Sequence, residues 1–188
     1  MSRQGFVFTV AFVLAACGSS GSNAPESSTN AMETNLQGFS STYNVTALEE
    51  KYVMVNLVPA PLDSVWPVLP GVFLELTVEP GTVDQKAHVI SNTSFVVHRS
   101  LGGVKLSRYV ECGRSISGAL ADQMDITMSL VVQVVADSAQ TSKLRTQLVA
   151  YGFSQATSGV RVHCSTTGAL ESHIAKMATD AVARRAKK

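Results

Sequence analysis

Apolar and polar residues alternate along much of the second half of the chain, with the two-residue period of strands that bury one face. The clearest example is Met124–Val135, whose apolar residues share one face: Ile126, Met128, Leu130 and Val132. In Val104–Cys112 the same period predicts that Tyr109 lies on the face opposite Leu106. Similar β-rich segments predict further strands at Tyr52–Val58, Leu76–Glu79, His88–Ser91, Phe95–His98, Leu144–Phe153 and Val160–Cys164, with a weaker one at Tyr43–Leu48.

Two other segments carry the spacing of a helix. In Leu62–Leu76 the apolar spacing is helical, but Pro67 and Pro70 lie inside it. Because a proline in a helix interior costs about 3 kcal/mol, we expect two short helices here, the second from about Pro70. Gly168–Lys188 is the longest helical pattern, and Glu171 and the basic residues at its end suit the helix dipole. Its apolar stripe consists of Leu170, Ile174, Met177 and Ala181.

The N-terminus has the pattern of an export signal. Arg3 precedes the apolar run Gly5–Ala16, which is shorter than the roughly 20 residues that span a bilayer. The run ends in Leu14-Ala15-Ala16-Cys17-Gly18, which resembles a bacterial lipobox, the signal for acylation of the cysteine and cleavage just before it. The alternative is an ordinary secretory signal in which Cys17 is incidental. We expect a signal peptide at 1–16, with Cys17 as the lipidation site.

Composition divides the rest of the chain. Residues 17–41 are rich in Ser, Asn, Gly and Thr without an apolar period, which predicts a flexible tether, and residues 42–188 suit one domain. The chain has 15 Lys and Arg against 14 Asp and Glu, a balance that does not suit a dedicated nucleic-acid binder.

Cys112 and Cys164 are the two cysteines left if Cys17 is lipidated. An even pair in an exported chain predicts a disulfide. A metal site with His163 and a Cys–His nucleophile are the alternatives, but neighbouring strand residues point to opposite faces, which separates His163 from Cys164. The sequence has no HExxH, CxxC, GxSxG, GxGxxG or Walker motif, so we expect neither an enzyme, nor a metal site, nor a cofactor.

Trp66 has two interpretations. It packs a short helix onto the sheet, or it lines a ligand cavity between the sheet and the long helix together with Phe73, Met128 and Ile174. The Arg- and Lys-rich end of the chain is either a solvated helix end or a contact for anionic lipid headgroups.

The order of these elements resembles the helix-grip fold, an α+β fold. There a strand leads into short helices, a curved antiparallel sheet follows, and a long C-terminal helix packs across it. VPAPLDSVWPVL (Val58–Leu69) is similar to the entry of that fold, while GALADQMDI and HCSTTGALE resemble uncharacterised bacterial exported proteins. With the tether, the chain distantly resembles the C-component lipoprotein of the outer-membrane β-barrel assembly machinery.

This resemblance implies a lipoprotein of the bacterial cell envelope. It would be anchored through N-terminal acyl chains, on the periplasmic face of an outer membrane if the cell has one. Two functions follow as expectations. The first is a non-catalytic interaction or assembly module with a protein partner. The second is binding of a small apolar ligand or lipid between the C-terminal helix and the sheet.

Overall fold

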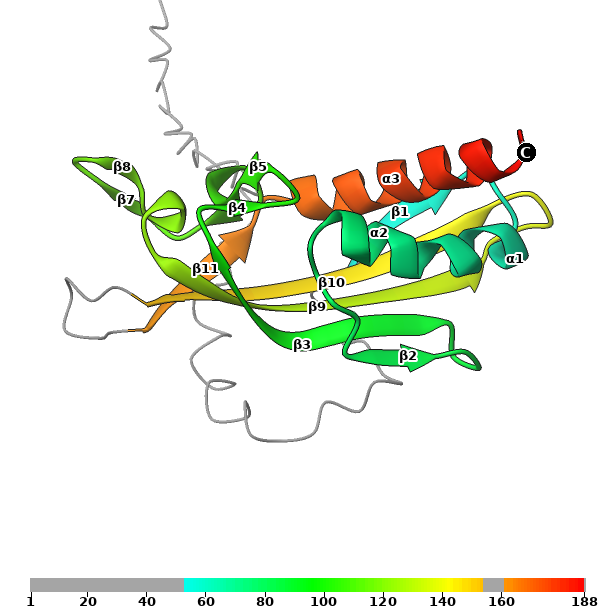
Figure 1. The fold of residues 1–188 in the computed structure, drawn as a ribbon, viewed down its shortest axis with the longest axis horizontal. Coiled ribbons are helices and arrows are strands. Elements are labelled where there is room, and N and C mark those ends of the chain that lie inside the picture. Colours follow the sequence, from blue (N-terminus) through cyan, green and yellow to red (C-terminus); the bar gives the residue numbers. More distant parts are fainter. Residues whose placement is uncertain (1–52, 154–160, 188) are drawn as a thin grey trace, which may run out of the picture. The chain divides into compact units, whose positions relative to one another are not determined.

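An antiparallel sheet forms the centre of the computed structural model, which describes residues 53–153 and 161–187 (Figure 1). Within these residues the sheet has seven strands in the order β2-β3-β9-β10-β11-β6, and β1 also pairs with β10. The strands are β1 (Val53–Val58), β2 (Thr82–Asp84), β3 (Val89–His98), β6 (Val110–Glu111), β9 (Asp125–Ala136), β10 (Ser142–Phe153) and β11 (Arg161–Thr166). The described residues all belong to the unit Tyr43–Lys188.

Strands β9 and β10 are the longest of these strands and pair along their whole lengths, from Ser142↔Ala136 to Phe153↔Asp125. The edge of β10 away from β9 is shared by two partners. Its first half pairs with β1 and its last four residues pair with β11. The predicted alternation in β9 is confirmed, because Ile126, Met128, Leu130 and Val132 are all buried.

The chain between β3 and β9 forms two small hairpins and two 3-10 turns. The hairpins are β4 (Ser100–Leu101) with β5 (Val104–Lys105) and β7 (Arg114–Ser115) with β8 (Gly118–Ala119). The turns are η5 (Leu106–Arg108) and η6 (Leu120–Asp122). Gly102 and Gly103 make the turn of the first hairpin, and both have positive φ.

Three helical pieces follow β1 where the sequence predicts two, because a 3-10 helix lies between the two short α-helices. They are α1 (Leu62–Val65), the 3-10 helix η4 (Trp66–Val68) and α2 (Leu69–Glu75). Pro67 and Pro70 occupy the first turns of η4 and α2, where their missing N–H groups cost no helical hydrogen bond.

Helix α3 (Ala169–Arg185) begins after Gly168, whose φ of 79° suits a residue without Cβ. Glu171 in its first turn accepts a 2.7 Å hydrogen bond from the Thr166 hydroxyl, which in turn accepts the Gly168 N–H. The helix contacts β1, β10 and α2, and Figure 1 shows it on the same side of the sheet as α1 and α2. The α+β fold class expected from the sequence is therefore confirmed.

One buried apolar cluster fills the space between these helices and the sheet. It includes Phe73 of α2, Met128 of β9 and Ile174 of α3, each exposed by 1% or less. Leu170 is fully buried too, whereas Met177 and Ala181 of the predicted stripe are half-buried at its edge.

Several predicted strands differ from the structure. Leu76–Glu79 is not a strand, because Leu76 caps α2 and Thr77 has a φ of 62°; the strand lies at β2 instead. His88–Ser91 and Phe95–His98 belong to one strand, β3, interrupted by an irregularity between Asn92 and Phe95. Val104–Cys112 is broken by η5, and this turn brings Tyr109 into the core beside Leu106 rather than opposite it.

The predictions for residues 1–52 lie outside the described residues. They comprise the signal peptide, lipidation at Cys17, the tether and the strand at Tyr43–Leu48. Among the described residues, no helix has the length and apolar character needed to cross a membrane.

Candidate functional site

Strand β1 presents apolar side chains at the surface. Val55 is 52% exposed, Leu57 63% and Met54 41%. Val55 and Leu57 stand in register with Arg145 and Lys143 of β10. No described strand pairs with the other edge of β1. An apolar strand that is paired on one side is a template for pairing with another chain.

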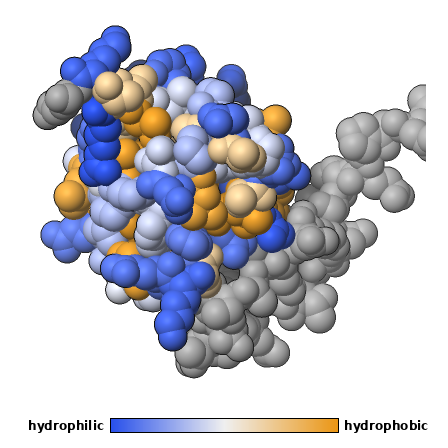
Figure 2. All heavy atoms as spheres, turned by 90° about the vertical axis from the view of Figure 1, so that its right-hand side faces the viewer, coloured by the Kyte–Doolittle hydropathy of each residue, from blue (hydrophilic) through white to orange (hydrophobic). Residues whose placement is uncertain are grey.

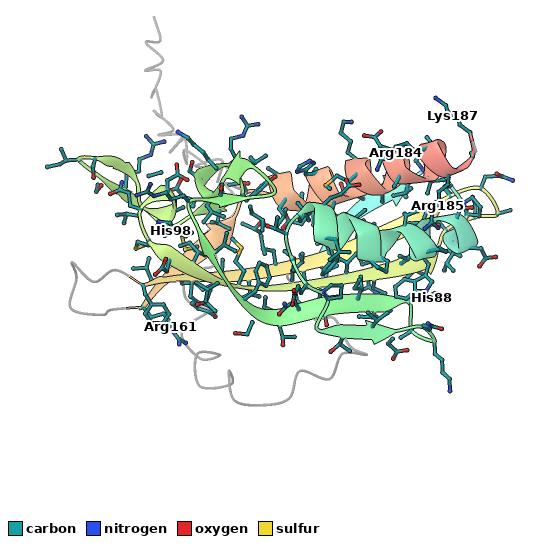
Figure 3. All side chains as sticks on the ribbon, viewed as in Figure 1. His88, His98, Arg161, Arg184, Arg185 and Lys187 are labelled. Atoms are coloured by element: carbon teal, nitrogen blue, oxygen red, sulfur yellow. A yellow bond between two sulfur atoms is a disulfide. The ribbon has the colours of Figure 1, made fainter. Side chains whose placement is uncertain are left out.

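A groove lies between α2 and the C-terminal part of α3. Its volume is about 270 Å³, and it is lined by Val68, Gly71, Val72, Glu75, Ala181, Arg184 and Arg185. Figure 3 shows Arg184, Arg185 and Lys187 at this end of the domain, and Figure 2 views it directly, with apolar residues reaching the surface among hydrophilic ones.

Arg184 donates a 3.1 Å hydrogen bond to Glu75 across the rim of the groove. Both side chains are more than half exposed, so the ion pair is solvated and contributes about 0–1 kcal/mol. Arg185, on the same rim, is exposed. The groove is thus apolar along its walls and carries two guanidinium groups and one carboxylate at its rim.

Gly71 lies inside α2, where glycine costs roughly 0.5–1 kcal/mol relative to alanine. A Cβ on Gly71 would meet nothing within 4 Å, and its φ is not positive. Neither a close contact nor the backbone conformation therefore requires glycine at this position.

The four residues considered for an internal cavity do not line this groove. Phe73, Met128 and Ile174 are packed in the core, and Trp66 is half-buried at its edge. The Trp66 ring meets the His88 ring edge-on at 5.4 Å. The groove is lined instead by residues of η4, α2 and the C-terminal part of α3.

Cys112 and Cys164 form a disulfide, as the sequence predicts. It joins the end of β6 to β11, which are themselves paired through Ser165↔Glu111. His163 points away from it and packs edge-on against Tyr151 of β10, with ring centroids 5.0 Å apart. Partial burial lowers the pKa of His163, and its Nε2 atom is buried without a hydrogen-bond partner in the described structure.

Two other polar pairs have the residue types of acid–base chemistry. Asp125 and His98 lie on paired strands, with Oδ1 and Nδ1 2.9 Å apart, and both are exposed. The hydroxyl of Tyr109 is 2.7 Å from Nδ1 of His173, and burial raises the pKa of that tyrosine. Among the described residues no three His, Cys, Asp or Glu side chains are grouped to hold a metal ion.

Sequence reasoning did not locate the groove or single out β1. For β1 a signal was present: the run Val-Met-Val-Asn-Leu-Val is apolar at every position except Asn56, so it cannot bury all of its apolar side chains on one face. The sequence holds no comparable signal for the groove. No protein-family model, curated protein or solved structure matches the chain.

Proposed function

We propose that this chain is a lipid-anchored, non-catalytic interaction module of the bacterial cell envelope, and that a protein partner binds at β1. The observation that carries the proposal is the exposure of Val55 and Leu57 on a strand paired only through β10 in the described structure. An extended segment of a partner would pair with the free edge, and its side chains would cover these two residues.

The core supports this function over carriage of a ligand between α3 and the sheet. Phe73, Met128 and Ile174 fill that space with side chains at most 1% exposed, so a ligand there would have to displace them. The anchoring part of the proposal rests on the lipobox-like sequence that ends at Cys17.

Site-specific photocrosslinking in living cells tests the interaction. A benzoyl-phenylalanine at position 57 is expected to give one discrete protein adduct. The same probe at Val96 is the control, because Val96 is 67% exposed but lies on β3, with β9 and β10 between it and β1. Val55→Lys should abolish the adduct from position 57. No adduct, or equal adducts from both positions, would refute binding at β1.

Metabolic labelling tests the anchor separately. Wild-type protein is expected to incorporate radiolabelled palmitate and to sediment with membranes. Cys17→Ala should lose the label and the membrane association. A wild-type protein that takes up no label would contradict lipidation and leave the test of β1 unaffected.

A further inference from the structure

Gly71, an exposed residue of α2, is one of the residues that line the groove between α2 and α3. Gly71 is the lining residue without a side chain, and a Cβ there would enter empty space. Alanine or leucine would favour the helix more and would partly fill the groove. Neither a close contact nor φ demands glycine at position 71, and its lack of a side chain keeps the groove open at this point.

The charged side chains at the rim of the groove carry a net positive charge. The lining residues include two guanidinium groups, Arg184 and Arg185, and one carboxylate, Glu75, which pairs with Arg184. Lys187 follows two residues after Arg185. Guanidinium groups bind carboxylates through paired, charge-assisted hydrogen bonds. The 3.1 Å contact of Arg184 with Glu75 shows a carboxylate already at this position, in an exposed pair that a ligand's carboxylate can replace.

The volume of the groove restricts the class of ligand that it can bind. The groove measures about 270 Å³, just below the roughly 300–1,000 Å³ of typical small-molecule pockets. Val68, Val72 and Ala181 give it aliphatic walls without aromatic rings. It therefore suits part of a single unbranched chain and is too small for a fused ring system or two chains side by side.

We propose that this groove binds a long-chain fatty acid, with the alkyl chain between α2 and α3 over Gly71 and the carboxylate at Arg184 and Arg185. This activity goes beyond the proposed interaction function. It uses neither β1 nor the anchor at Cys17, so either proposal can fail without the other.

Native mass spectrometry of the full chain, released from a non-ionic detergent, tests the proposal with stearate as the probe. The expected result is an adduct that saturates at one stearate per chain. Methyl stearate has the same chain without the charge, and its binding should be weaker by about tenfold because the charge-assisted hydrogen bonds are lost. Arg185→Gln should weaken stearate binding and leave methyl stearate unaffected.

Gly71→Leu is the decisive variant, because position 71 lines the groove and a Cβ there meets nothing within 4 Å. It should reduce stearate binding by at least about tenfold, with a thermal midpoint no lower than that of the wild type. Ala183→Leu is the matched control, since it adds the same side chain at an exposed position of α3 outside the groove and should bind like the wild type.

Three results would overturn the inference. They are no stearate adduct on the wild-type chain, equal binding of stearate and its methyl ester, or undiminished binding by a folded Gly71→Leu protein. The comparison of the two ligands uses the wild-type chain alone and so holds even if a variant fails to fold.

Discussion

At the scale of single residues, two neighbours on β11 have opposite surroundings. Cys164 faces the core and is linked to Cys112, while His163 faces the other way and packs on Tyr151. Successive side chains of a strand point to opposite faces, and this alternation alone predicted that His163 and the Cys164 sulfur lie on different faces. What it did not indicate is that His163 is partly buried, with Nε2 lacking a partner.

The lowered pKa of His163 makes folding sensitive to acid. Above about pH 6.5 the imidazole is neutral in both states and contributes no pH dependence. Below that value the unfolded chain binds a proton that the folded chain resists, so the free energy of unfolding should fall until the pH reaches the folded-state pKa. Urea titrations between pH 7.5 and 5 on wild type and His163→Gln measure this.

The His163→Gln protein should show a flatter profile over that range. Above about pH 6.5 the two proteins should show the same slope, which serves as the internal control. Parallel profiles for wild type and His163→Gln would contradict the assignment.

At the scale of elements, two helices each have a glycine near their N-terminus, and only one of these glycines is required by the backbone conformation. Gly71 lies in the first turn of α2, where an added Cβ would meet open space, whereas Gly168 precedes α3 with a φ of 79°. A Cβ on Gly168 would also lie 2.7 Å from the Met54 side chain. The same substitution should therefore change stability in opposite directions at the two sites.

Gly71→Ala should raise the free energy of unfolding by about 0.5–1 kcal/mol through helix propensity. Gly168→Ala should lower it by about 1 kcal/mol or more, because it adds left-handed strain and a contact with Met54. Chemical denaturation of both variants against wild type provides the measurement. A destabilised Gly71→Ala protein would show that the glycine has a structural role.

Helix α2 gives a second test through two adjacent residues. Phe73 is fully buried in the core, while Leu74 is 60% exposed. Phe73→Ala should cost about 3–5 kcal/mol, and Leu74→Ala should stay within about 0.5 kcal/mol apart from its small propensity change. Similar costs for the two variants would contradict the orientation of α2.

The elements that were predicted correctly are those with long, unambiguous periods, such as β9, β10 and α3. The predictions of strands were wrong where a helix end and turn have the same alternation of buried and exposed residues as a strand. Leu76 and Val78 are buried and Thr77 is exposed, which imitates a strand although the segment is a helix end followed by a turn. The groove was not predictable, because Gly71 and Ala181 lie far apart in sequence and meet only when α2 packs on α3.

At the scale of the whole molecule, the disulfide ties an irregular region to the sheet. The segment from Ser100 to Asp122 holds only two-residue strands and 3-10 turns, and few regular hydrogen bonds fix it. The Cys112–Cys164 bond links this region to β11 near the start of α3.

Replacing both cysteines by serine should lower the free energy of unfolding by about 4 kcal/mol, since the bond closes a loop with a sequence separation of 52 residues. Denaturation of the oxidised wild type, the reduced wild type and the double variant provides the comparison. The reduced wild type should resemble the variant. If oxidised and reduced proteins unfold together, the disulfide contributes no stability.

The pairing of β1 with β10 also determines the order in which the protein can fold. Val53–Val58 leaves the ribosome early, yet its partners Ser142–Gln147 follow about 90 residues later. Such long-range pairing has a high contact order, which slows folding and leaves an apolar strand unpaired until most of the chain has emerged. Strand β1 is therefore exposed to other chains twice, first while its partner strand is still being made and later as an edge of the sheet that the structure describes.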